Sequence, residues 1–152
     1  MVDVRRLRDC AHGLGHRVPG DTPAELIDPF AGDLLPGWYD EWLTAPRERW
    51  HGVRLRALEI LAERLLSEER HFLATEAAVA AIQLEPFRES SRRALIRTHL
   101  AEGNRAQAAR ELERFRVLLR DELGVAPSPE LVALVACDAK TAAFRPTVES
   151  AR

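Results

Sequence analysis

The sequence predicts an all-α domain, and three observations support this fold class. Apolar residues recur with the three- and four-residue spacing of amphipathic helices. No stretch of useful length alternates apolar and polar residues as a half-buried strand does. The chain has 152 residues, of which 46% are hydrophobic and 30% are charged, a balance typical of one globular domain. We expect residues 1–144 to form this single domain and residues 145–152 to form a disordered tail.

Two short helices are expected at the start of the chain. Apolar residues at helical spacing predict the first over residues 2–14. The second begins at Thr22, because a threonine N-cap followed by proline, with Glu25 three residues after the cap, forms a capping box. Pro29 ends this second helix early.

Four longer helices follow, and residues that break or end helices mark their boundaries. A broad apolar stripe begins after Pro46 and continues to a break at 67–72. Pro86 ends the next helix, and Gly103 ends the one after it. We expect helices over 46–66, 72–85, 88–102 and 105–123.

These four helices contain an internal repeat, because a shift of 34 residues brings apolar positions into register. The turn at 67–71 also falls on the turn at 101–105. The aligned pairs are Leu61 with Leu95, Ala62 with Ile96, Ala74 with Ala108, Ala78 with Leu112, and Ala81 with Phe115. A helix–turn–helix unit of this length resembles the tetratricopeptide repeat; a bundle whose spacing matches by chance is the alternative.

Small residues and a proline give the repeat its structural signature. Ala74 and Ala108 let the second helix of each hairpin approach the first, where a larger side chain would overpack. Pro86 stands where the first repeat closes, whereas the second repeat has Arg120 there and continues as helix. Two repeats alone are too few to bury a continuous core. We therefore expect N-terminal and C-terminal helices to cap a tetratricopeptide-like stack.

The stretch 120–131 separates the fourth long helix from a fifth. Gly124 supplies a left-handed stop, and Pro127 prevents the helix from continuing. Ser128 is placed to cap the next helix, with Pro129 at its first position. We expect this last helix to fold back over the exposed end of the stack, so the joint has a structural role.

Motifs for catalysis or for binding a cofactor or metal are not found in the sequence. The chain has no GxSxG, HExxH, phosphate-binding loop or EF-hand pattern. Its five histidines are scattered, and Cys10 and Cys137 lack metal-ligand spacing, so we interpret these cysteines as buried thiols. We expect a protein that is not an enzyme and uses no cofactor or metal; the alternative of a hidden enzyme has no residue support.

Charge and hydropathy limit the partners that we expect. The net charge of −2 argues against direct DNA binding, because domains that grip nucleic acid are usually basic. No apolar run approaches the ~18 residues that span a membrane, and the first residues do not form a signal peptide. We expect a cytoplasmic protein without membrane contact. Lysine is almost absent among the basic residues, a composition typical of GC-rich genomes.

An aromatic segment is the first candidate for partner binding. Trp38, Tyr39 and Trp42 lie close together in the sequence, with Trp50 further on. They form either a satellite core that seals the N-terminal helices onto the first repeat, or an exposed anchor for a partner, since tryptophan and tyrosine are favoured at interface hot spots.

The arginines of the helix over 88–102 are the second candidate. Arg88, Arg92, Arg93 and Arg97 fall on one broad face. This face is either solvated and ion-paired with nearby glutamates, or a surface for an acidic partner or a DNA backbone. Arg92 aligns with the apolar Leu58 under the 34-residue shift, which favours an exposed or groove-lining position.

Several of these stretches resemble the bacterial transcriptional activation domain of the Streptomyces antibiotic regulatory protein family. The resemblance covers roughly residues 30–135 and is strongest over 42–66 and 81–131. Its most specific parts are "LEPFRES" at 84–90 and "ELGVAPSPEL" at 122–131. It implies an actinobacterial regulatory module that contacts a DNA-binding domain, another copy or RNA polymerase. A peptide-binding adaptor unrelated to transcription is the alternative.

In that family a winged-helix DNA-binding domain normally precedes the activation domain. The opening residues "VDVRRL" (2–7) resemble the first residues after that winged domain. We therefore expect the activation domain alone, either as a fragment or as a natural stand-alone protein. Contact with DNA would then be indirect or weak.

Overall fold

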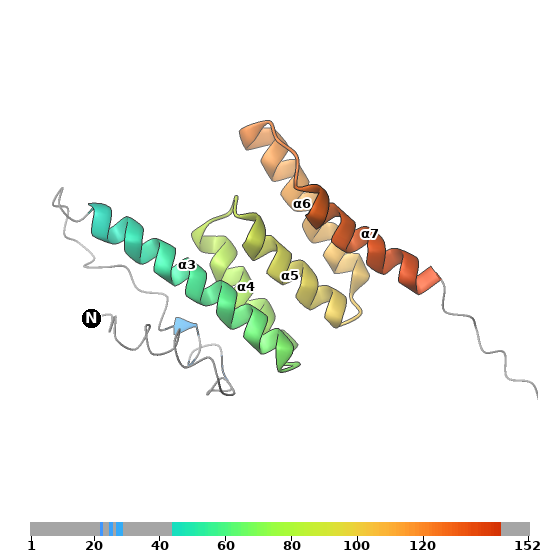
Figure 1. The fold of residues 1–152 in the computed structure, drawn as a ribbon, viewed down its shortest axis with the longest axis horizontal. Coiled ribbons are helices and arrows are strands. Elements are labelled where there is room, and N and C mark those ends of the chain that lie inside the picture. Colours follow the sequence, from blue (N-terminus) through green and yellow to red (C-terminus); the bar gives the residue numbers. More distant parts are fainter. Residues whose placement is uncertain (1–21, 23–24, 26, 29–43, 144–152) are drawn as a thin grey trace, which may run out of the picture.

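The computed structural model describes residues 22, 25, 27, 28 and 44–143. The described part contains five long α-helices and no strand, which confirms the all-α prediction (Figure 1). They are α3 (Thr44–Ser67), α4 (His71–Leu84), α5 (Glu89–Ala101), α6 (Arg105–Leu123) and α7 (Pro129–Ala143). The first four lie within two residues of their predicted bounds. The predictions for 2–14, for the aromatic segment and for the tail fall outside the described residues.

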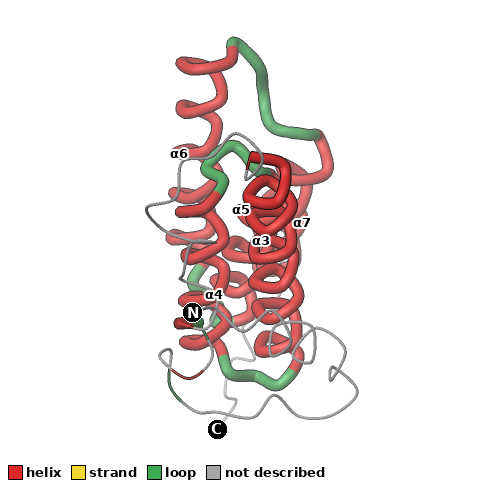
Figure 2. Tube along the Cα trace, turned by 90° about the vertical axis from the view of Figure 1, so that its left-hand side faces the viewer, coloured by secondary structure: helices red, strands yellow, loops and turns green. Residues whose placement is uncertain are grey.

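The helices form two layers. Helices α3, α5 and α7 lie side by side in one layer, and α4 and α6 form the other (Figures 1 and 2). Each helix packs against the next one in the chain, and α5 also contacts α3 and α7 within its layer. This arrangement of the described helices is compatible with a stack of helical hairpins that α7 caps at its C-terminal end.

The burial of the core residues is compatible with the internal repeat. All ten side chains that the 34-residue shift aligns are buried. One apolar cluster joins α3, α4 and the middle of α5, and it contains Ala74 and Trp50. A second cluster joins α5, α6 and α7, and it contains Ala108, Phe115 and Leu131. The two hairpins therefore bury equivalent positions in adjoining clusters.

Left-handed residues end three of the helices. Gly124 follows α6 with a φ of 67°, and its N–H donates to the Arg120 carbonyl at 3.1 Å, as predicted. Gly103 follows α5 with a φ of 74°. Glu69 follows α3 with a φ of 58° and occupies the position that aligns with Gly103. A residue with a Cβ atom thus adopts a conformation that costs roughly 1–2 kcal/mol.

The last helix, α7, begins directly after Ser128, where the sequence predicted. The Ser128 hydroxyl accepts a hydrogen bond from the Leu131 N–H at 3.2 Å, which confirms its N-cap role, and Pro129 is the first helical residue. The buried Leu131 anchors α7 in the second cluster. Cys137 on α7 is exposed, so the prediction of a buried thiol is wrong there.

The Glu25 N–H donates to the Thr22 hydroxyl at 3.3 Å, as expected for the predicted capping box.

Among the described helices, none has a stretch that is both long and apolar enough to cross a lipid bilayer.

Candidate functional site

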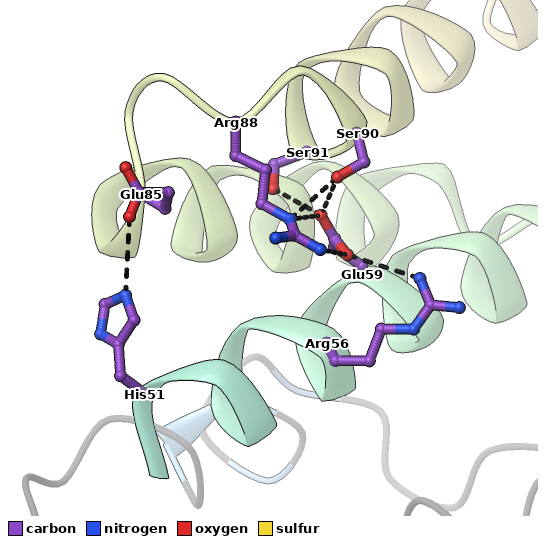
Figure 3. Close-up of polar contacts among 7 residues, drawn as sticks. All are labelled: His51, Arg56, Glu59, Glu85, Arg88, Ser90 and Ser91. Atoms are coloured by element: carbon purple, nitrogen blue, oxygen red, sulfur yellow. Dashed lines mark hydrogen bonds and ion pairs between the residues drawn. The ribbon is translucent and has the colours of Figure 1, made fainter. Parts of the chain in front are cut away.

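A buried carboxylate on α3 joins the first turn of α5. Glu59 is 5% exposed and accepts hydrogen bonds from Arg88 Nε at 2.8 Å and from Nη2 at 3.3 Å (Figure 3). It also accepts from the Ser91 hydroxyl at 2.9 Å and from the Ser90 hydroxyl. Burial by itself raises the pKa of the Glu59 carboxyl, but the hydrogen bonds that it accepts outweigh burial and hold the pKa below its usual range. Glu59 therefore remains ionised and ties two helices of one layer together.

The edge of this polar cluster is exposed to solvent. Arg56 Nη1 lies 3.6 Å from Glu59 Oε2, and the Arg56 side chain is 68% exposed. Nearer the start of α3, His51 Nε2 lies 3.9 Å from Glu85 Oε2, beyond the end of α4 (Figure 3). Such exposed contacts add little to stability because water screens them.

A second carboxylate joins α5 to the joint before α7. Glu89 Oε2 accepts from the Ser128 N–H at 2.9 Å, and its Oε1 accepts from the Ser128 hydroxyl and from Arg93 Nη2 at 2.7 Å. Burial raises the pKa of Glu89, but these hydrogen bonds outweigh burial and lower it overall. Glu89 belongs to the "LEPFRES" stretch and Ser128 to "ELGVAPSPEL", so the two specific stretches are bound to each other.

The alignment of Arg92 with Leu58 favoured an exposed or a groove-lining position for this arginine. The structure contradicts the exposed position. Its side chain is only 13% exposed, and Nη1 lies 3.1 Å from Glu111 Oε2 on α6. The guanidinium carbon lies 5.6 Å from the centre of the Phe115 ring. Burial lowers the pKa of Arg92 and the Glu111 charge opposes this shift. Arg92 thus holds α5 on α6.

Glu111 is a charged residue on the inward face of α6. It is buried, and besides Arg92 it accepts hydrogen bonds from Arg114 and from Gln107 Nε2, the latter at 3.3 Å. On the exposed face of this helix, Arg116 pairs with Glu113 and Arg120 pairs with Asp121, each at 2.8 Å. Glu111 instead contributes to the contact between α5 and α6.

The four candidate arginines divide into three groups. Arg92 is packed between helices, whereas Arg88 and Arg93 are half exposed and bound to carboxylates. Arg97 is exposed and forms no ion pair with the described residues. Trp38, Tyr39 and Trp42 fall outside the described residues, so both interpretations of the aromatic segment stay open.

Sequence reasoning missed Glu59 and the contact between Glu89 and Ser128. A signal for Glu59 was present, because it lies at helical spacing between the buried Leu55 and Ala62, on the inward face of α3. The Glu89–Ser128 contact had no local signal, since it joins residues 39 positions apart. Within the described ranges, no group of three or more His, Cys, Asp or Glu side chains is placed to hold a metal ion.

Comparison with known protein families shows to which family the chain belongs. The family described as the bacterial transcriptional activator domain matches residues 24–136. The match includes α3 to α6 and the Glu59, Glu89 and Ser128 contacts. Comparisons with curated proteins and with solved structures found no match. Because the family match spans most of its length, the chain belongs to the bacterial transcriptional activator domain family.

Proposed function

We propose that the chain is a non-enzymatic interaction module of a Streptomyces-antibiotic-regulatory-protein-type transcriptional regulator. It acts in the cytoplasm through protein contacts with a DNA-binding domain, with another copy of itself or with RNA polymerase. The single observation that carries this proposal is the family match over residues 24–136. The two-layered helical stack supports it, because stacked helical hairpins present extended surfaces to protein partners.

The contacts of Glu59 and Glu89 support a structural rather than a catalytic role for these carboxylates. Clefts with strongly perturbed titratable groups are typical of active sites. Here the perturbed carboxyls of Glu59 and Glu89 are engaged by donors that join one helix to another. Their shifted pKa values are accounted for by packing, and we assign these residues a structural role.

Protein rather than DNA is the partner that the charge favours. A net charge of −2 provides little attraction for a phosphate backbone. Contact with DNA is therefore proposed to be indirect, through a partner that itself binds the promoter.

A transcription assay with purified components tests this proposal. The chain is fused to a heterologous DNA-binding domain whose site lies upstream of a weak promoter, and transcript yield with bacterial RNA polymerase is measured. We expect more transcript than with the DNA-binding domain alone, and co-elution of the chain with the polymerase or with a winged-helix partner. A folded chain that neither raises transcription nor co-elutes with either protein would overturn the proposal. A peptide-binding adaptor unrelated to transcription would give that result.

A further inference from the structure

We propose that the outer face of α5, with the adjoining turn of α3, binds an acidic segment of a partner protein. This arginine face consists of Arg56, Arg88, Arg93 and Arg97. The inference rests on the proposed function and deepens it, since it names the surface used and the chemistry of the partner.

The arginine face draws its residues from two neighbouring helices, α3 and α5. Arg56 on α3 and Arg88 at the start of α5 both reach Glu59, so their guanidinium groups lie close together (Figure 3). Arg93 and Arg97 follow on α5, one turn apart and therefore on the same side of the helix. The side chains of Arg88 and Arg93 are 42% and 43% exposed. All four guanidinium groups are thus available to solvent on one layer of the stack.

The carboxylates of this region already accept hydrogen bonds within the fold, whereas the arginines retain N–H donors that these bonds do not use. Glu59 accepts hydrogen bonds from three side chains, and Glu89 accepts from Ser128 and Arg93. A guanidinium has five N–H donors. Arg93 is bound to Glu89 through Nη2, and Arg97 has no ion pair with a described residue. The region therefore presents charged donors whose own acceptors are already occupied.

Exposed acids lie on both helices that flank α5 in its layer. Glu63 on α3 occupies the position that aligns with Arg97 under the 34-residue shift, and it is exposed. Glu130 in the first turn of α7 is exposed as well. DNA carries one phosphate charge per roughly 1.7 Å and is bound by extended basic surfaces. Four arginines on a layer whose neighbouring helices carry exposed acids suit a short acidic protein segment better.

Fluorescence anisotropy with a defined probe tests this inference. The probe is a short fluorescein-labelled peptide of alternating glutamate and alanine, and the glutamine–alanine peptide is its neutral counterpart. We expect the acidic peptide to bind, the neutral one not to bind, and added salt to weaken binding. Arg97→Glu should raise the Kd about tenfold, as expected for loss of a charged hydrogen bond and gain of a repulsive charge.

Arg110→Glu is the matched control, because Arg110 is an exposed arginine on α6, in the other layer. It makes the same change in net charge and should alter the Kd less than twofold. Equal weakening by both variants, or no binding by the wild-type chain, would overturn the inference. A DNA duplex that binds tightly and is released by Arg97→Glu, while the acidic peptide is not bound, would overturn it as well.

The peptide titration and the transcription assay fail independently. A wild-type fusion that raises transcription although the chain ignores the acidic peptide leaves the proposed function intact and overturns the arginine face. The opposite result is peptide binding that Arg97→Glu weakens, combined with no effect of the fusion on transcription and no co-elution. That result overturns the proposed function and supports the arginine face. Thermal unfolding of both variants checks that each is folded.

Discussion

The two helical hairpins bury the same positions with different chemistry. In the first hairpin, Leu58 on α3 and Ala77 on α4 are buried apolar residues. The positions that align with them in the second hairpin are Arg92 and Glu111, which form an ion pair. At these aligned positions, apolar residues pack the first hairpin, whereas an ion pair joins the two helices of the second. Since burying two charges carries a large desolvation penalty, the second arrangement depends on both partners being present.

Removing one partner of the buried ion pair should have the largest effect. Glu111→Ala leaves Arg92 buried without its carboxylate, and we expect a loss of about 3–5 kcal/mol in the free energy of unfolding. Urea denaturation measures it. Glu113→Ala removes a solvent-exposed ion pair on the same helix and should cost under about 1 kcal/mol.

The double variant Arg92→Leu with Glu111→Ala turns the second hairpin into a copy of the first at these positions. Replacing a buried ion pair by apolar residues is often neutral or stabilising. We expect the double variant to be more stable than Glu111→Ala alone. If it is instead the less stable of the two, the hairpins are not interchangeable in the way that the 34-residue shift suggests.

Enlarging a small residue of the first hairpin should have the next largest effect. Ala74 is fully buried where α4 meets α3, so Ala74→Leu should overpack the interface and cost about 1–3 kcal/mol. Ala108→Leu, at the aligned position, should behave alike. Denaturant midpoints measure both, and Ala109→Leu at an exposed neighbour is the control. A cost at only one of the two alanines would show that just one hairpin is closely packed.

The pH dependence of stability compares two carboxylates at the start of α5: Glu59 on α3, which binds this turn, and Glu89, which belongs to it and binds Ser128. The folded state lowers the pKa of both Glu59 and Glu89, so each stabilises the fold above the usual glutamate pKa of about 4.3. That stabilisation is lost as the pH falls through the lowered values. The free energy of unfolding should therefore be smaller at acidic than at neutral pH, as urea denaturation at both pH values would measure. Glu59→Gln and Glu89→Gln should each reduce the pH-dependent part; an unchanged slope would rule out the linkage.

The smallest expected effect concerns the left-handed residue after α3. Glu69→Gly should stabilise the chain by about 1 kcal/mol, because glycine adopts a positive φ without the cost imposed by a Cβ atom. Gly103→Ala and Gly124→Ala should destabilise it by a similar amount, although open space surrounds both positions. Thermal melting measures the three shifts. Gly124→Val should likewise lower stability without selectively removing partner binding.

The sequence allowed the helices to be placed but not their long-range polar contacts. Gly124, Ser128 and Ala74 were predictable because a glycine stop, a serine cap and a small residue in a repeat act on their immediate surroundings. Arg92 was predicted to be exposed or groove-lining, because a charge in place of an apolar residue indicates contact with solvent. It packs between α5 and α6 because Glu111 lies opposite, 19 residues away in the chain. Such mutual dependence has no local signature, so only the folded arrangement reveals it.

The contact between Glu89 and Ser128 has a consequence for how sequences of this kind vary. The carboxylate satisfies both the backbone and the hydroxyl of the residue that caps α7. Loss of the Glu89 carboxylate leaves the Ser128 N–H and hydroxyl without this acceptor, whereas loss of the Ser128 hydroxyl leaves Glu89 with the backbone N–H and Arg93 as donors. We therefore expect the two positions to covary among related chains, with the glutamate kept wherever a hydroxyl residue precedes the proline of the last helix. The family resemblance of two separate stretches then reflects a single inherited interaction.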